Sequence, residues 1–265
     1  IDTGIFGSLQ SYPPIKNPNI KFYLPDTFSP DAKANPKFLS IFQSFNLEMV
    51  NQNKAISRAI GISQLNLFYK LFSQGIISFS SLNSILGHLV KEKVNSKYKS
   101  RRSLIQNVLG FQMFLKAVNN NRPEFATYFT NHLAGMMHRY WRDLFPEDFN
   151  LNNKEIDTFH SKSILKAMHL ADQDSHELLK LSRKYDYDIW VISSMGQQAI
   201  DRGEYQAELY LKDFQRFLFN LGLKIDNFKL LPAMQPDYCI ECSTEKNLNL
   251  LRNCLSELKD TNGDL

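Results

Sequence analysis

Two histidines, His132 and His138, stand between a strand-like and a helix-like segment and are the residues best suited to chemistry. Before them, the segment 124–129 (EFATYF) has the aromatic and β-branched content of a buried strand. Polar groups that follow such a strand lie where open α/β sheets place their reactions, just beyond the carboxyl ends of the strands. Imidazoles at that place can bind a metal ion or exchange a proton. Either histidine alone could equally pack or cap a helix, but the pair favours a site.

A second strand end is expected to bring hydroxyl and amide groups to the same place. Residues 188–192 (DIWVI) have the pattern of a buried strand, and a long amphipathic helix is predicted before them over 156–185. A helix that leads into a strand is half of a βαβ unit, so we expect a parallel sheet. Ser193, Ser194 and Gln197 follow that strand and are predicted to face the two histidines.

Arg139 and Asn131 are candidate substrate-binding residues beside the histidines, together with Ser193 and Gln197. A guanidinium offers a fork of donors for phosphate oxygens. Arg139 could instead form a surface ion pair with Asp143, four residues on. A further interpretation makes Ser194 a nucleophile with one of the histidines as its base, although no glycine-flanked elbow surrounds that serine.

Two other patterns have metal-ligand spacing, and both are interpreted as structural. His169, Asp172 and His176 share one face of the predicted long helix, which is more typical of a solvated face than of a ligand set. Cys239 and Cys242 have the CxxC spacing, but no second such pair and no nearby histidine completes a zinc set.

Composition indicates a globular protein with a large core, since 43% of the 265 residues are hydrophobic and 22% are charged. A net charge of +4 does not by itself indicate a nucleic-acid polymer as partner. The basic run 91–102 is interpreted first as a solvated helix end and second as an anion-facing patch. No stretch approaches the roughly 20 apolar residues of a membrane span. Three cysteines and no visible signal peptide favour the cytoplasm, although the chain begins at Ile1 and could be a partial product.

The order of the predicted elements indicates one α/β domain over 1–265, whole or partial, with a mostly parallel sheet flanked by helices. Extended segments are predicted within 1–12 and at 22–27, the second after a proline pair. From 37 to 118 apolar residues recur at helical spacing. We therefore expect a helical insertion over 37–118, between two strand-bearing stretches.

Three segments, taken in order, resemble a known family: 7–14 (GSLQSYPP), 128–141 with its MHRY motif, and 188–196 (DIWVISSMG). They look like the strand and proline-rich turn, the GHRYGP-like metal-binding stretch, and the strand ending in SDHG of the type I phosphodiesterases and nucleotide pyrophosphatases. Those enzymes belong to the alkaline phosphatase superfamily. The resemblance implies a two-zinc hydrolase of phosphate esters with a threonine or serine nucleophile. It makes His138 a metal ligand and places His132 or Asn131 near the family's aspartate ligand.

The chain also departs from that family. Residues 193–196 (SSMG) replace the Asp-His pair with side chains that bind zinc poorly, and no later Gly-x-His ligand follows His176. The expected function is therefore hydrolysis of phosphoesters with altered or incomplete metal ligation. Its substrate would be a small nucleotide or glycan phosphate, with zinc or manganese held by His138 and His132. The alternative is a non-catalytic binding or assembly module that keeps the fold without the two-metal site.

Overall fold

The chain forms two compact units, Ile1–Met49 with Ile56–Gly203 and Val50–Ala55 with Glu204–Leu265. The computed structural model describes residues 1–27, 29–51, 62–73, 75–151, 156–193, 195–200, 211–231 and 238–259. Where the sequence indicated a single domain, each unit has a hydrophobic cluster of its own, as separate folding units do. The two units are therefore described one at a time.

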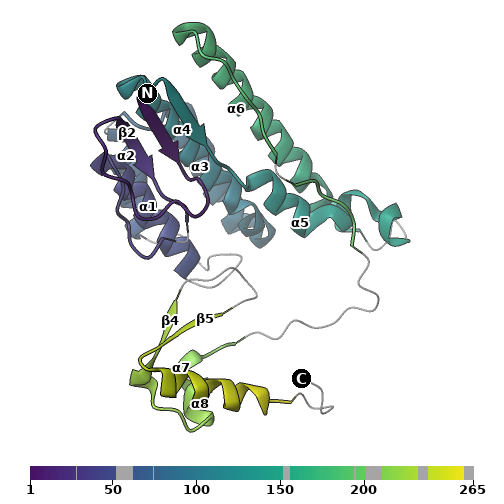
Figure 1. Ribbon diagram of the computed structural model, residues 1–265. Helices are drawn as coiled ribbons and strands as arrows, with labels where there is room; N and C mark the ends of the chain where they lie inside the picture. Colours follow the sequence, from purple (N-terminus) through teal and green to yellow (C-terminus); the bar gives the residue numbers. More distant parts are fainter. Residues whose placement is uncertain are drawn as a thin grey trace. The chain divides into compact units, whose positions relative to one another are not determined.

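The first unit contains a parallel sheet of three described strands, β1 (Thr3–Phe6), β2 (Ile20–Leu24) and β3 (Phe125–Tyr128). Their order is β2-β1-β3, and β1 pairs parallel with both neighbours (Figure 1). This confirms the expected α/β class with a parallel sheet flanked by helices. A methyl group on Gly4 would lie 2.2 Å from the buried ring of Phe22, so the close approach of β1 and β2 side chains requires glycine there.

The chain between β2 and β3 is helical in its described parts, as the apolar spacing predicted. Figure 1 shows these helices gathered on one side of the sheet. Phe6 and Phe22 of the sheet pack against Phe42 and Phe114 of this helical layer, which buries one face of the sheet. The helices are α1 (Lys37–Asn51), α2 (Ile62–Ser73), α3 (Phe79–Val94), the 3-10 helix η1 (Ser96–Arg101) and α4 (Arg102–Asn121).

Two more helices follow β3 and pack against each other. Met136 and Tyr140 of the first contact Ile164 and Ala167 of the second, and all four side chains are buried. These elements are α5 (His132–Leu144), the 3-10 helices η2 (Pro146–Phe149) and η4 (His160–Lys162), and α6 (Ser163–Tyr185). The long helix predicted over 156–185 is confirmed from Ser163 to Tyr185, whereas 156–162 form a loop, a turn and η4. Asp186 follows the helix in a left-handed conformation (φ 59°).

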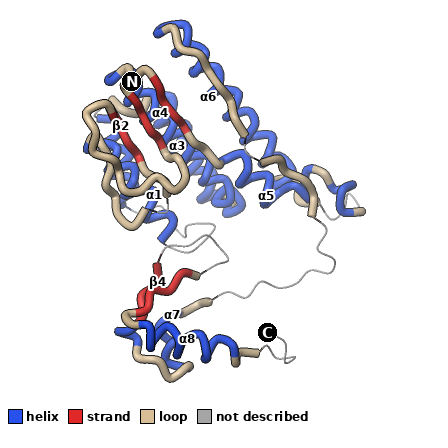
Figure 2. The backbone as a smooth tube through the Cα atoms, in the orientation of Figure 1, coloured by secondary structure: helices blue, strands red, loops and turns tan. Residues whose placement is uncertain are grey.

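The strand predicted over 188–192 is wrong for this structure. The segment is a loop (Figure 2), and its apolar side chains face solvent: Trp190 is 83% exposed, Val191 88% and Ile192 82%. A short apolar run has strand propensity, but it becomes a strand only when a neighbouring strand supplies hydrogen-bond partners. Among the described strands β3 pairs only with β1, so no described strand is hydrogen-bonded to its other edge.

The second unit has a two-stranded antiparallel sheet, in which β4 (Phe228–Leu231) pairs with β5 (Cys239–Cys242). The apolar spacing of 205–221 in the sequence is helical. In the described part of this segment, α7 (Phe214–Asn220) begins only after Asp213 caps it, while 201–210 lie outside the described residues. The 3-10 helix η5 (Ile225–Asn227) and α8 (Glu245–Ser256) complete the unit.

None of the helices in the described ranges combines the length and apolar character needed to cross a bilayer. The thiols of Cys239, Cys242 and Cys254 are all free.

Candidate functional site

The carboxyl ends of β1 and β3 meet at one edge of the parallel sheet, and residues with polar side chains gather there. Ser8, just after β1, has its Oγ 3.1 Å from Thr127 Oγ1 on β3. Gly7 turns the chain after β1 with φ 72°, a conformation that favours glycine. Thr130 and Asn131 lie between β3 and α5. We call Ser8, Thr127, Thr130 and Asn131 the rim.

From Thr130, which is exposed at the rim, a chain of polar side chains leads into the protein to the buried Asn107 and His132. Thr130 Oγ1 lies 2.6 Å from Asn107 Oδ1 and 2.8 Å from His132 Nδ1. Tyr128 OH donates to Asn107 Oδ1 at 3.1 Å, and Asn107 Nδ2 donates to Asp174 Oδ2 at 2.7 Å. These five residues, which we call the buried network, join β3, α4, α5 and α6.

The contacts of the buried network can be checked by counting the hydrogens available for them. If Asp174 is ionised and His132 is neutral, the network is one hydrogen short. His132 Nε2 lies 3.2 Å from the Ala167 carbonyl and must donate to it. If Thr130 gives its hydroxyl hydrogen to Asn107, then His132 must carry hydrogens on both nitrogens. If Thr130 gives it to His132, the Asn107 amide must turn its nitrogen toward Thr130. The amide oxygen then faces Asp174, which must be protonated.

Burial decides between these two arrangements. It lowers the pKa of His132, despite the opposing contact with the Ala167 carbonyl, so the imidazole is neutral near pH 7. Burial also raises the pKa of Asp174 to about 6, although the hydrogen bond from Asn107 opposes the change. The pKa of Tyr128 is raised by burial too. Both shifts favour the uncharged form, so His132 is neutral near pH 7 and Asp174 holds its proton only below about pH 6.

The two predicted catalytic and metal-ligating histidines do not come together. His132 is only 6% exposed, and both its ring nitrogens have partners within the protein. His138 lies six residues later on the same helix, and its side chain is exposed to solvent. A metal ion would need lone pairs from both rings, and this arrangement does not offer them. In the described part of the chain, no group of three His, Cys, Asp or Glu side chains is placed to hold a metal.

The predicted substrate-binding residues divide between the rim and the loop after α6. Asn131 is exposed at the rim and precedes α5 without a capping hydrogen bond from its side chain. Arg139 is exposed on α5 and forms no ion pair with a described residue, including Asp143. Asp143 Oδ1 instead accepts from the backbone N–H of Asp157 at 3.2 Å.

Ser193 and Gln197 do not reach a strand end in this structure, because the segment that leads to them is not paired with the sheet. Ser193 is exposed, and its hydroxyl donates to the Met195 carbonyl at 2.7 Å. Gln197 is partly exposed. Ser194, predicted as a catalytic residue, lies outside the described residues.

Sequence reasoning missed Asn107 and Asp174, the two residues that connect the rim to α4 and α6. A signal was present for Asp174. It falls on the apolar stripe of its helix, seven residues after Ala167 and four before Leu178, where a carboxylate is out of place. A polar residue on an apolar stripe is expected to be hydrogen-bonded inside the protein. Asn107 occupies a comparable place on α4 and is 6% exposed.

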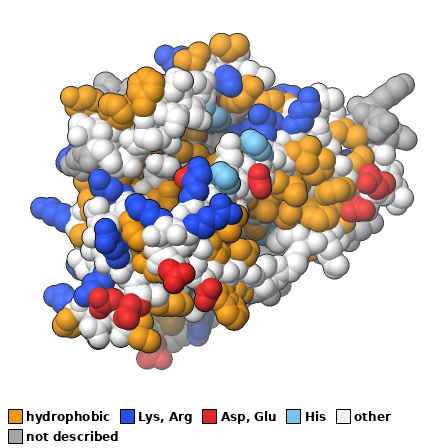
Figure 3. Space-filling model, turned by 90° about the horizontal axis from the view of Figure 1, so that it is seen from above, with side chains coloured by type: hydrophobic (Ala, Val, Ile, Leu, Met, Phe, Trp, Pro, Cys, Tyr) orange, Lys and Arg blue, Asp and Glu red, His pale blue; other side chains and the backbone are white. Residues whose placement is uncertain are grey.

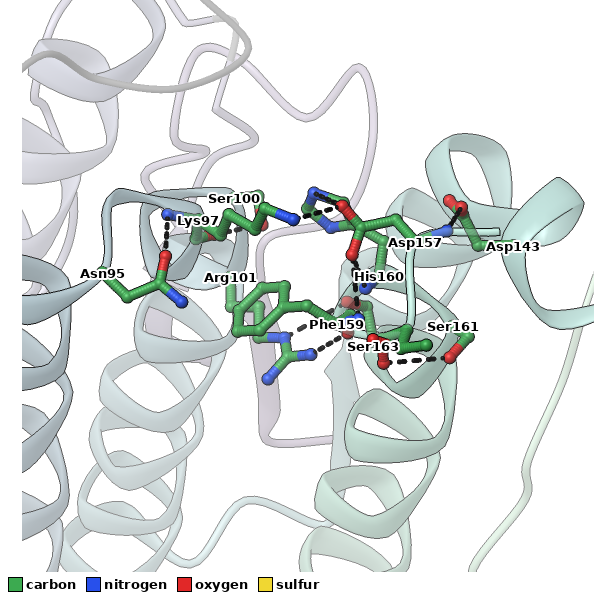
Figure 4. Close-up of polar contacts among 11 residues, drawn as sticks. Asn95, Lys97, Ser100, Arg101, Asp143, Asp157, Phe159, His160, Ser161 and Ser163 are labelled. Carbon is green, nitrogen blue, oxygen red and sulfur yellow. Dashed lines mark hydrogen bonds and ion pairs between the residues drawn. The ribbon is translucent and has the colours of Figure 1, made fainter. Parts of the chain in front are cut away.

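A second polar cluster joins the start of α4 to the start of α6 (Figure 4). Arg101 is 3% exposed, and its guanidinium lies 3.7 Å from the centre of the Phe159 ring. Its Nε donates to Ser163 Oγ at 3.1 Å, and its Nη2 donates to the Phe159 carbonyl. Asp157 accepts hydrogen bonds from two backbone N–H groups at the start of η4. It also accepts from Lys97 Nζ at 2.6 Å, and this lysine is the main cause that lowers the pKa of Asp157 to about 2.

Comparisons with protein-family models, curated proteins and solved structures found no significant match to this chain. The functional argument therefore rests on the residues and their geometry.

Proposed function

We propose that this chain is a phosphoester hydrolase of the alkaline phosphatase kind, related to type I phosphodiesterases and nucleotide pyrophosphatases, with an altered metal site. The observation that carries the proposal is the rim, where hydroxyl and amide side chains meet at the carboxyl edge of a parallel sheet. These groups can hydrogen-bond the oxygens of a small nucleotide or glycan phosphate. The order of β1, the helical layer, β3 and the histidine-bearing α5 supports the same kinship. The three free thiols support a cytoplasmic protein.

The residues present do not fit a two-metal centre, so no step of the reaction is derived through zinc or manganese. His132 has both nitrogens engaged and is locked by the buried network. Its proposed role is to position Thr130 at the rim. His138 is exposed and is therefore accessible to a substrate or to a metal ion that has further ligands. Acid–base assistance by a positioned imidazole typically contributes about 100-fold or more to a rate.

Activity is tested with the purified chain on an aryl phosphodiester and an aryl phosphomonoester, each with and without added zinc or manganese. We expect turnover, and we expect His138→Ala to lower kcat/KM by about 100-fold. The matched control is His176→Ala, because His176 is an exposed helical histidine away from the rim. Equal activity of the two variants would remove His138 from the reaction.

A non-catalytic binding module is the second candidate, and the engagement of His132 favours it. An imidazole whose two nitrogens are held by Thr130 and the Ala167 carbonyl cannot also act on a substrate without breaking the buried network. Retained binding of the phosphate esters, with no turnover under any metal condition, would favour this candidate over the hydrolase.

The proposed site is completed when 188–192 pairs with the unpaired edge of β3 as a fourth parallel strand. Tyr187 OH donates to the Pro123 carbonyl at 2.7 Å, so the segment starts beside the beginning of β3. Its exposed apolar side chains are typical of a strand without its partner. Pairing in this direction would bring Ser193, Ser194 and Gln197 toward the rim.

Cysteine pairs test this docking, because a disulfide traps the paired arrangement even when the segment visits it only part of the time. In a variant with the native cysteines replaced by serine, Ala126→Cys is combined with Trp190→Cys or with Val191→Cys. Side chains alternate along a strand, so we expect one of the two pairs to oxidise readily. The control combines Ala126→Cys with Leu179→Cys on α6. If neither strand pair forms more disulfide than the control, the segment does not dock on β3.

A further inference from the structure

We propose that three cationic side chains, from η1, η4 and α6, form a binding site for a phosphate group: Arg101, Lys162 and Lys166. The inference goes beyond the proposed function, because none of these residues belongs to the rim or to the buried network. It gives a role to the basic run 91–102, whose second interpretation was an anion-facing patch.

Arg101 is the buried anchor of this site. Its side chain is held between the Phe159 ring and Ser163, so its position is fixed before any ligand arrives. Two of its three nitrogens donate to Ser163 and Phe159, and the third, Nη1, has no partner among the described residues. Figure 4 shows that nitrogen turned away from both partners. A buried guanidinium with a free donor is prepared for an oxygen ligand.

Two lysines lie close to Ser163, the residue that Arg101 contacts. Lys166 lies one helical turn after Ser163 and therefore on the same side of α6. Lys162 directly precedes Ser163. The pKa of Lys166 is lowered, first by burial and then by the charges of Arg101, Lys91 and Lys162. Positive charges that lower a neighbour's pKa repel one another, and a bound anion would reduce that repulsion.

Carboxylates near the cluster are already engaged. Asp157 is bound by Lys97 and by two backbone N–H groups at the start of η4. Glu92 is bound by Arg102 through both carboxylate oxygens. The first turn of α6 contains no acidic residue. Within the described residues, Arg101, Lys162 and Lys166 form no salt bridge with a carboxylate.

A phosphate group matches this arrangement better than a carboxylate does. It carries up to two negative charges and has several oxygens, so it can take one hydrogen bond from the guanidinium and others from the ammonium groups. Figure 3 shows one face of the molecule on which several Lys and Arg side chains gather, with Asp and Glu side chains among and beside them. Inorganic phosphate and a phosphate monoester share this chemistry.

The test is titration calorimetry of the full chain with inorganic phosphate and, separately, with phenyl phosphate at constant ionic strength. We expect binding that Lys166→Gln weakens about tenfold, the effect of losing one charge-assisted hydrogen bond. Lys162→Gln combined with Lys166→Gln should weaken it further. Tighter binding of phenyl phosphate than of inorganic phosphate would identify a monoester as the ligand, and the reverse would identify the free ion.

The matched control is Lys180→Gln, an exposed lysine on the same helix that pairs with Glu177. Acetylation of lysines with acetic anhydride supplies a second readout, and phosphate should protect Lys162 and Lys166 but not Lys180. Absence of phosphate binding by the unmodified chain, or equal affinity in Lys166→Gln and Lys180→Gln, would overturn the proposal. Turnover of the aryl phosphodiester should be the same in Lys166→Gln as in the unmodified chain, which separates this site from the rim.

Discussion

Replacing Arg102 with methionine is expected to lower the free energy of unfolding by about 3–5 kcal/mol, the usual cost of leaving one buried charge without its partner. Arg102 Nε and Nη2 donate to the two oxygens of Glu92 at 2.8 and 2.5 Å, and both side chains are 6% exposed. His88 lies 3.2 Å from the same carboxylate, but burial lowers its pKa, so it does not replace the guanidinium at neutral pH. Urea unfolding at pH 7.5 measures the change.

Replacing both Arg102 and Glu92 shows how much of the lost stability comes from the unpaired charge and how much from lost side-chain packing. Combining Arg102→Met with Glu92→Met removes both charges, and we expect most of the stability to return because no buried charge is left unpaired. Lys180→Met serves as the control, since its ion pair with Glu177 is exposed and such pairs contribute about 0–1 kcal/mol. A double variant as unstable as Arg102→Met alone would assign the loss to packing.

The sequence predicted best those elements whose apolar pattern extends over several helical turns. The helix stripe around Phe42 and the long helix ending near Tyr185 each supply a regular pattern over several turns, and both formed. The strand at 125–128 formed because β1 pairs with it. The run Ile189–Ile192 has a similar strand propensity, but its own residues do not determine whether another strand lies beside it to pair with.

The candidate site was predictable only in part for a related reason. A strand followed by Thr130, Asn131 and His132 correctly indicated where polar groups gather. It did not indicate which ring would be buried, because that depends on how α5 rests against α6 through Met136 and Ala167. The ring of His132 contacts Thr130, just before α5, and the Ala167 carbonyl of α6, and spacing along one helix carries no information about a contact with another helix.

The buried network makes a pH-dependent prediction for Asp174. Its pKa is about 6 in the folded chain against a usual value of 3.8, so the folded state holds a proton that the unfolded state releases. The free energy of unfolding should therefore fall as pH rises from about 4 to 6, and stay lower above that range. The carboxyl is partly exposed, and after allowing for solvent screening the loss is about 1–2 kcal/mol.

Asp174→Asn tests this directly, because the asparagine amide supplies permanently the hydrogen that the network needs from a protonated carboxyl. At pH 8 the variant should be more stable than the unmodified chain by about 1–2 kcal/mol, and below pH 4 the two should be nearly equal. Urea unfolding across pH 4–8 measures the difference, with Asp172→Asn, an exposed acid on the same helix, as the control. A variant less stable at pH 8 would mean that the network requires the carboxylate. His132 would then be protonated on both ring nitrogens and positively charged, and the neutral form inferred for its imidazole would be wrong.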